Sequence, residues 1–219
     1  MKVLVIGATG RLGYQLVHSA LEKGHEVTAF ARNIEEFDQT HPHLQLVKGD
    51  VLYPALVEAA VTAHDAVLSV IGVRKFSGPI TLLSRGMQHV VAAMHKQGVK
   101  RLLTVTGAGI LQEQADKLIM DTLSFPPNLQ NISLDHRAVY ELLRQSDLDW
   151  TIACPAFMTR GHRTRAFLLR RDYYPSGARN EVSLQDVADF MTDEMVRNEF
   201  IHARVGIAQP YQYEEDYIF

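Results

Sequence analysis

The sequence predicts an α/β fold in which helices cover both faces of a doubly wound parallel sheet. Short apolar runs typical of buried strands alternate with stretches of helical apolar spacing, starting at the first residues. A glycine-rich turn joins the first of these strands to the first helix. The length of 219 residues and the hydrophobic fraction of 47% suit one globular domain, so we expect residues 1–219 to form a single unit.

The elements follow one another in a regular order. Residues 3–6 are a continuous apolar run and predict the first strand, and apolar residues at helical spacing over 12–21 predict the first helix, which ends at Gly24. A box of Ser and Asp at 183–186 predicts the start of the last helix, which runs to about residue 196. The other predicted strands are 26–30, 44–47, 66–71, 101–106 and 150–153, and the other predicted helices are 54–63, 81–97 and 134–145.

Two long segments interrupt this alternation, at residues 107–132 and 158–180. Long loops in compact domains are usually functional, and both segments follow the carboxyl end of a strand, where ligands bind in open α/β sheets. We therefore expect them to be insertions on the substrate side that form an acceptor pocket, with a small C-terminal lobe above it. The tail at 210–219 mixes acidic and aromatic residues and is expected to dock on this chain or on a partner.

The composition excludes several classes of function. A net charge of −3 gives no electrostatic footprint for nucleic acid, and a single Cys rules out an internal disulfide framework or a Cys-x-x-Cys metal site. His41 and His43 lack a third ligand, so no metal site is predicted. No apolar run reaches the roughly 20 residues of a spanning helix. We expect a cytoplasmic protein, monomeric or homodimeric, that acts on a small molecule.

The loop Gly7-Ala8-Thr9-Gly10-Arg11-Leu12-Gly13 has the composition and the position of a phosphate-binding turn. Glycines allow a tight turn and a close approach of the backbone to a pyrophosphate. The helix that follows offers free N–H groups and a favourable dipole to the phosphates. Because the loop lies between a strand and a helix, the pattern predicts dinucleotide binding.

This spacing of glycines resembles the extended and atypical short-chain dehydrogenases/reductases. The similarity continues at Gly49-Asp50-Val51, Ser69-Val70-Ile71-Gly72, the run 148–152 with Cys154-Pro155, and Val182–Met191. Within that superfamily the chain is similar to the small NmrA-like and biliverdin reductase B (flavin reductase)-like branch. The resemblance implies an NAD(P)-binding Rossmann fold whose cofactor contacts Gly7, Thr9, Gly10, Arg11, Leu12, Gly13, Asp50, Val51, Ile71, Gly72, Thr106, His136, Pro155 and Phe157.

The end of the second strand bears on the choice between NADP(H) and NAD(H). An NAD site usually has a carboxylate there to hold the ribose hydroxyls, but this strand is followed by Arg32. Arg32 and Arg11 suit a 2′-phosphate, which guanidinium groups bind in a bidentate way. We therefore predict NADP(H). Glu35 and Glu36 lie close enough in sequence to keep NAD(H) as an alternative.

The catalytic residues expected from the resemblance are only partly present. The superfamily's Tyr and Lys pair falls on Ile132 and His136, which argues against a standard alcohol dehydrogenase mechanism. His136 is a candidate to hydrogen-bond the nicotinamide ribose or to supply a proton near neutral pH, with Asp135 raising its pKa. The alternative for His136 is an exposed residue in the first helical turn. Thr106 is the candidate to bind a reacting carbonyl, or a structural strand residue.

Two further positions differ from the biliverdin reductase B-like branch. Its Ser and His correspond to Gly107 and Phe157, which puts biliverdin reduction in doubt. Phe157 and Met158 would form an apolar floor that suits hydride transfer to a stacked flavin, acting as a substrate, although such residues are more often core. An excess of arginines in the second long segment suits a flavin phosphate or another anion, or a solvated surface: Arg160, Arg163, Arg165, Arg170, Arg171 and Arg179.

The leading hypothesis is an NADP(H)-dependent oxidoreductase that passes a hydride from NADPH to a small or flavin-like acceptor. The alternative is a redox sensor that resembles NmrA-like proteins and binds NADP without turnover. An NAD-dependent epimerase or dehydratase follows from the fold resemblance only.

Overall fold

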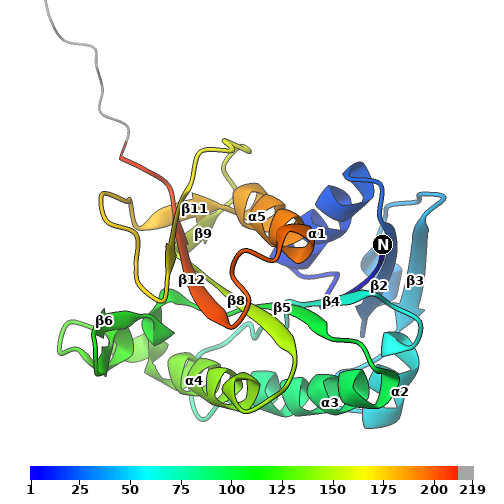
Figure 1. Cartoon of the computed structure of the whole chain (residues 1–219), viewed down its shortest axis with the longest axis horizontal. Helices are drawn as coiled ribbons and strands as arrows, with labels where there is room; N and C mark the ends of the chain where they lie inside the picture. The colour runs from blue at the N-terminus through cyan, green and yellow to red at the C-terminus, as the bar shows by residue number, and fades with distance from the viewer. Residues whose placement is uncertain (212–219) are drawn as a thin grey trace, which may run out of the picture.

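The computed structural model describes residues 1–211 and has a sheet of eight strands at its centre, in the order β10-β12-β8-β5-β4-β1-β2-β3 (Figure 1). Seven of the strands are parallel, and β10 joins the edge antiparallel to β12. The predicted doubly wound sheet is therefore confirmed. The strands are β1 (Lys2–Ile6), β2 (Glu26–Ala31), β3 (Leu44–Lys48), β4 (Ala66–Ser69), β5 (Arg101–Val105), β8 (Asp149–Pro155), β10 (Leu168–Arg171) and β12 (Ala203–Ala208).

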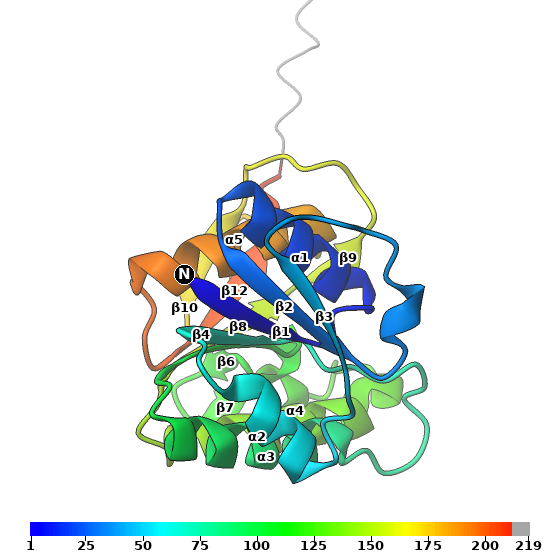
Figure 2. The same ribbon diagram turned by 90° about the vertical axis from the view of Figure 1, so that its right-hand side faces the viewer.

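Within residues 1–211, five α-helices cover the two faces of this sheet (Figure 2). On one face α1 (Arg11–Glu22) packs against α5 (Leu184–Arg197), and on the other α3 (Leu82–Gln97) lies between α2 (Pro54–Val61) and α4 (Gln130–Arg144). Each face has its own apolar core, because the strands are buried on both sides. Gly24 ends α1 with a φ of +77°, and the Ser183 hydroxyl accepts the Asp186 N–H at 3.0 Å, so both predicted caps are confirmed.

Helix α4 and strand β12 differ from the sequence prediction, and the short strands within the two long segments were not predicted either. Helix α4 begins at Gln130, four residues before the predicted start, so His136 lies in its second turn rather than its first. Strand β12 was not predicted, because Arg204 and Gly206 interrupt its apolar pattern. In the structure the Arg204 guanidinium pairs with Asp172 at 3.1 Å and stacks on the Tyr140 ring, which makes a buried arginine tolerable in this strand.

The two long segments contain the small additional sheets. Residues 107–132 include the hairpin β6 (Gln112–Gln114) and β7 (Lys117–Leu118), which lies beside α4. The second segment holds β10, and β9 (Phe157–Thr159) pairs in parallel with β11 (Glu181–Ser183). The expected C-terminal lobe consists only of the sheet of β9 and β11 and the segment that connects them. The later elements α5 and β12 belong to the main domain, because α5 covers the central sheet and β12 is one of its strands.

The part of the chain that the structure describes, residues 1–211, contains no helix with the length and apolar character needed to cross a bilayer. The sequence predicts that the tail at 210–219 docks on this chain or on a partner. Residues 212–219 of this tail lie outside the described part.

Candidate functional site

The loop between β1 and α1 has a backbone that only glycines permit. Gly7 has a φ of +89°, and a Cβ there would lie 2.8 Å from the Val70 carbonyl oxygen at the end of β4. A Cβ on Gly13 would lie 2.1 Å from the Gly7 carbonyl oxygen. The first turn of α1 therefore packs directly on the loop, at the point where the strand order reverses between β1 and β4. This switch point is where open α/β sheets bind their ligands.

The N-terminus of α1 is open to an anion. Gly10 has no side chain to cap the helix, and the first turn contains no acidic residue. No carboxylate of this first turn therefore competes with a ligand for the first N–H groups of α1. Thr9 is half-buried beside the loop, whereas Leu12 points into the core and acts structurally. A cleft of about 360 Å³ lies here, lined by Thr9, Gly10, Arg11, Tyr14, Gln15, Arg160, Gly161, Leu184 and Gln185.

The residues predicted to select the cofactor lie at the tip of β2. Arg32 follows the strand directly, is exposed, and has no ion pair within residues 1–211. Glu35 pairs with Lys48 at 2.5 Å, and that hydrogen bond lowers the pKa of the Glu35 carboxyl. Glu36 accepts a hydrogen bond from Asn33 at 3.1 Å. Both carboxylates thus have local partners. Arg32 does not line the cleft that contains Arg11.

The turn after β3 forms the predicted adenine side. A Cβ on Gly49 would lie 2.2 Å from the Phe30 ring, so this position requires glycine. The half-buried Asp50 accepts the Leu52 N–H at 3.0 Å and thereby fixes the turn. Val51 is buried, and its carbonyl accepts a hydrogen bond from His89 Nδ1 at 2.8 Å. This arrangement leaves Asp50 with acceptor capacity for a ligand.

The loop after β4 runs beside the glycine loop. Ile71 is half-buried, and its side chain lies 3.1 Å from the position of a Cβ on Gly86 of α3. Gly72 is exposed and has open space around its Cα. The structure therefore brings Ile71 and Gly72 to the carboxyl edge of the sheet, next to Gly7.

At the predicted nicotinamide end, Thr106 is buried and its hydroxyl lies 3.2 Å from the Cys154 thiol. Burial raises the pKa of this thiol to about 12, so Cys154 stays protonated, as expected for an inert core residue. Pro155 is buried at the end of β8. Phe157, two residues further, is 73% exposed, and an exposed aromatic ring at the carboxyl edge is available to a planar ligand.

The expectation that His136 gains a proton near neutral pH is wrong. Burial lowers the pKa of its imidazole to about 4, and the opposing effect of the Asp135 charge is smaller. Asp135 is itself buried and directed at α3, where it accepts the N–H groups of Leu83 at 2.9 Å and Ser84 at 3.2 Å. The neutral His136 ring lies 3.6 Å from the position of a Cβ on Gly107. His136 thus remains at the edge of the site as a neutral hydrogen-bonding group.

The arginines of the second long segment have different roles, which the sequence does not distinguish. Arg163 pairs with Glu22 at 2.9 Å, and Arg179 pairs with Glu181 at 3.3 Å. Arg171 donates to the Glu199 carbonyl at 2.9 Å, and Arg170 stacks on the Tyr173 ring. Of the six, only Arg160 lines the cleft at the glycine loop. In the sequence, Arg160 is marked only by its membership of this arginine cluster. Its position at the cleft depends on contacts between residues that are distant along the chain.

No group of three potential metal ligands occurs in residues 1–211. His41 and His43 are exposed and stack on each other with ring centroids 5.6 Å apart.

The fold and the glycine loop define a dinucleotide-binding protein of the Rossmann type. The chain belongs to the NAD(P)H-binding family, whose model matches residues 7–198. It is 28% identical to the Bacillus subtilis protein YwnB over 214 residues, which cover 94% of this chain and 98% of YwnB.

Two solved structures share the fold over nearly their whole length. A protein from Burkholderia pseudomallei, described as a “putative exported protein”, is 30% identical with a TM-score of 0.83, and the match covers 95% of this chain and 99% of that one. A “putative NADH-flavin reductase” from Streptococcus pneumoniae is 26% identical with a TM-score of 0.83 and the same coverage. The chain is thus a member of the NAD(P)H-binding family, and it shares its fold with these two proteins.

Proposed function

We propose that the protein is an NADPH-dependent reductase that transfers a hydride to a flavin-like acceptor. The observation that carries this proposal is the open N-terminus of α1 behind a loop of required glycines, with Arg32 exposed at the tip of β2. When bound, NADPH supplies the hydride, and an oxidised flavin takes it together with one proton from water. The protein contributes binding and orientation.

The preference for the 2′-phosphate is supported by the charges around β2. An NAD site needs a carboxylate free to accept the ribose hydroxyls. Glu35 is held by Lys48 and Glu36 by Asn33, whereas Arg32 has no ion pair within residues 1–211. A free guanidinium beside two engaged carboxylates favours NADPH. The Streptococcus relative's name gives NADH as the donor, so both cofactors belong in the test.

A flavin-like acceptor is supported by what surrounds the nicotinamide end. The exposed Phe157 follows β8, and the exposed Phe76 lies on the loop after β4. Parallel strands present both segments at the carboxyl edge of the sheet, so the two exposed rings suit a flat apolar ring system. Reduction of such a ring needs little help from a protein acid, and the neutral His136 supplies none at pH 7.

The test is oxidation of NADPH and NADH by purified protein with flavin mononucleotide, riboflavin and a quinone as acceptors. The proposal expects turnover that saturates in a flavin and a higher kcat/KM with NADPH than with NADH. Saturable turnover with a quinone but with neither flavin would reject the flavin assignment and keep the reductase. Absence of NADPH binding would reject both.

A second candidate function is a redox sensor that binds NADP without turnover. Three observations favour it: the Tyr and Lys pair is absent from the sequence, the Thr106 hydroxyl faces Cys154, and His136 is neutral at pH 7. Tight NADPH binding with no oxidation by any of the three acceptors would support this candidate.

A further inference from the structure

Two arginines from opposite halves of the chain meet at the glycine loop. Arg11 is the first residue of α1, and Arg160 follows β9. Both line the cleft of about 360 Å³ that opens at Gly10 and the N-terminus of α1. No carboxylate is among the residues that line it, and both arginines are exposed without an ion pair in the described chain. The cleft is therefore positively charged, and the first N–H groups of α1 open into it.

The segment that carries Arg160 is fixed to α5. We call residues 160–166 the strap. The carboxylate of Asp186, in the first turn of α5, is fully buried and accepts two backbone N–H groups of the strap: Thr164 at 2.9 Å and Arg165 at 2.8 Å. It also accepts the Thr164 hydroxyl at 2.7 Å. Three bonds to one buried carboxylate hold this end of the strap in a single position.

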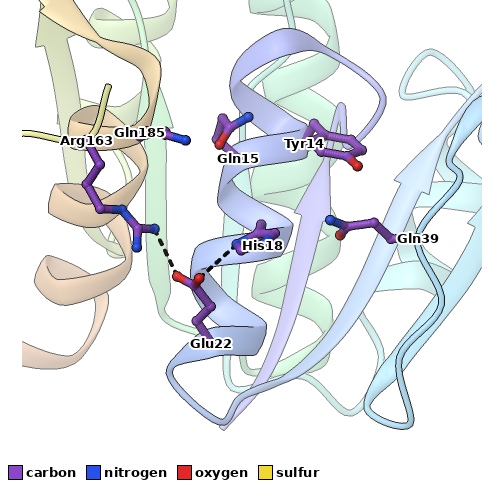
Figure 3. A pocket seen from close by; sticks show the side chains of 7 residues that line it. All are labelled: Tyr14, Gln15, His18, Glu22, Gln39, Arg163 and Gln185. Atoms are coloured by element: carbon purple, nitrogen blue, oxygen red, sulfur yellow. Dashed lines mark hydrogen bonds and ion pairs between the residues drawn. The ribbon is translucent and has the colours of Figure 1, made fainter. Parts of the chain in front are cut away.

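The strap is also fixed to α1. The Arg163 guanidinium pairs with Glu22 of α1 at 2.9 Å and with Asp189 of α5 at 3.0 Å. Figure 3 shows Arg163 reaching across to Glu22, which His18 contacts from its other side at 3.3 Å. Asp189 in turn accepts the Ser19 hydroxyl at 2.8 Å. The strap therefore bridges α1 and α5, and Arg160 lies at its start, over the glycine loop.

We propose that Arg160 binds the diphosphate of the dinucleotide from the side opposite the glycine loop. The inference rests on the binding of NAD(P)H that the proposed function requires. The N–H groups of α1 contact the diphosphate from one side, and the Arg160 guanidinium donates to it from the strap. A guanidinium suits this position because it forms paired hydrogen bonds with phosphate oxygens. Arg160 then contributes to the binding of NADPH and NADH alike, whereas Arg32 distinguishes them.

The experiment measures dissociation constants by calorimetry for wild type, Arg160→Ala and Arg32→Ala. The ligands are NADPH, NADH, ADP, which has a diphosphate but no 2′-phosphate, and 2′-AMP, which has no diphosphate. Loss of one charge-assisted hydrogen bond should weaken NADPH, NADH and ADP about 10-fold in Arg160→Ala. Binding of 2′-AMP should not change. Arg32→Ala should give the opposite pattern, with 2′-AMP and NADPH weakened and ADP unchanged.

Arg170→Ala is the matched control, because it removes one positive charge from the same long segment on the edge strand β10, outside the cleft. Arg160→Lys keeps the charge and should retain part of the affinity. Equal constants for Arg160→Ala and Arg170→Ala, with normal wild-type binding, would overturn this inference and leave the proposed function intact. Weakened 2′-AMP with unchanged ADP in Arg160→Ala would also overturn it. A wild-type protein that binds neither dinucleotide would overturn both.

Discussion

Arg32 is the residue on which the choice of cofactor depends most directly. Reversing its charge in Arg32→Glu places a carboxylate where the 2′-phosphate of NADPH is expected and leaves the ribose of NADH with a possible acceptor. We expect NADPH affinity to fall roughly 100-fold, because a charge-assisted contact is lost and a repulsion between two negative charges is added. NADH affinity should change little. Titration of both cofactors by quenching of Trp150 fluorescence or by calorimetry measures this difference.

The control for that experiment is Arg137→Glu, an exposed charge reversal on α4. It produces the same change in net charge away from β2. Equal losses for NADPH and NADH in Arg32→Glu would contradict the assignment of the 2′-phosphate to this residue.

His136 connects the site to acid stability. The pKa of its imidazole, about 4 in the folded protein, lies below the ordinary value of 6.5 for a histidine side chain. Between these two values the unfolded chain binds more protons than the folded one, so the stabilising effect of a neutral His136 is complete above pH 6.5 and is lost as the pH falls toward 4. Between pH 6.5 and pH 4, the free energy of unfolding should therefore fall by roughly 1–3 kcal/mol less in His136→Gln than in wild type.

Urea denaturation of wild type and His136→Gln at several values between pH 4 and pH 7.5 measures the effect. His136→Gln keeps a hydrogen-bonding side chain, so the comparison isolates the titration. His64 is a useful second variant, because burial lowers its pKa as well. Parallel stability curves for wild type and His136→Gln would show that this ring does not titrate below its usual range.

At the scale of elements, the strap depends on ion pairs that connect α1 and α5. Arg163→Gln removes the contacts to Glu22 and Asp189 and leaves the Asp189 carboxylate, which is mostly buried, with fewer partners. We expect the unfolding free energy to fall by about 1–2 kcal/mol. We also expect weaker NADPH binding, because Arg160 is then held less firmly over the loop.

A double-mutant cycle separates positioning from direct contact. If Arg163 acts through Arg160, Arg163→Gln should weaken NADPH binding in wild type and have a much smaller effect in Arg160→Ala. Arg144→Gln is the control, since Arg144 forms an exposed ion pair with Glu141 on the other face. Additive effects of Arg163→Gln and Arg160→Ala would contradict the positioning role.

The elements also show what a sequence can and cannot predict. The strands β1 to β5 and the glycine loop were predictable, because buried-strand patterns and glycine requirements are local. Strand β12 was not, because its Arg204 is neutralised by Asp172, which lies 32 residues earlier. The strap was not predictable either. The Arg163 to Glu22 contact spans 141 residues, and no local pattern distinguishes Arg160 from the arginines beside it.

The prediction that the pKa of His136 is raised was wrong for a related reason. Adjacent residues suggested that Asp135 would raise it, but in the helix the Asp135 carboxylate is directed at the N-terminus of α3. The dominant effect on His136 is burial, which depends on packing of the whole domain.

At the scale of the whole molecule, the proposed cofactor site joins the first β-α unit to a segment that lies about 150 residues later in the sequence. The glycine loop belongs to the first β-α unit, and Arg160 belongs to a strap held by α5. A ligand that contacts both parts stabilises the folded state by mass action, by about 2.7 kcal/mol at a concentration of 100 times Kd. For a domain of this size that corresponds to a rise in Tm of roughly 5–10 °C.

We therefore expect NADPH to raise the Tm measured by differential scanning fluorimetry, and to raise it more than NADH does at equal concentration. Amide hydrogen exchange in the strap and in residues 7–13 should slow together, because one ligand contacts both. Arg160→Ala should retain protection of residues 7–13 and lose it in the strap. Protection confined to residues 7–13 in the wild type would mean that the cofactor contacts the glycine loop alone, and that the strap serves only to hold α5 against α1.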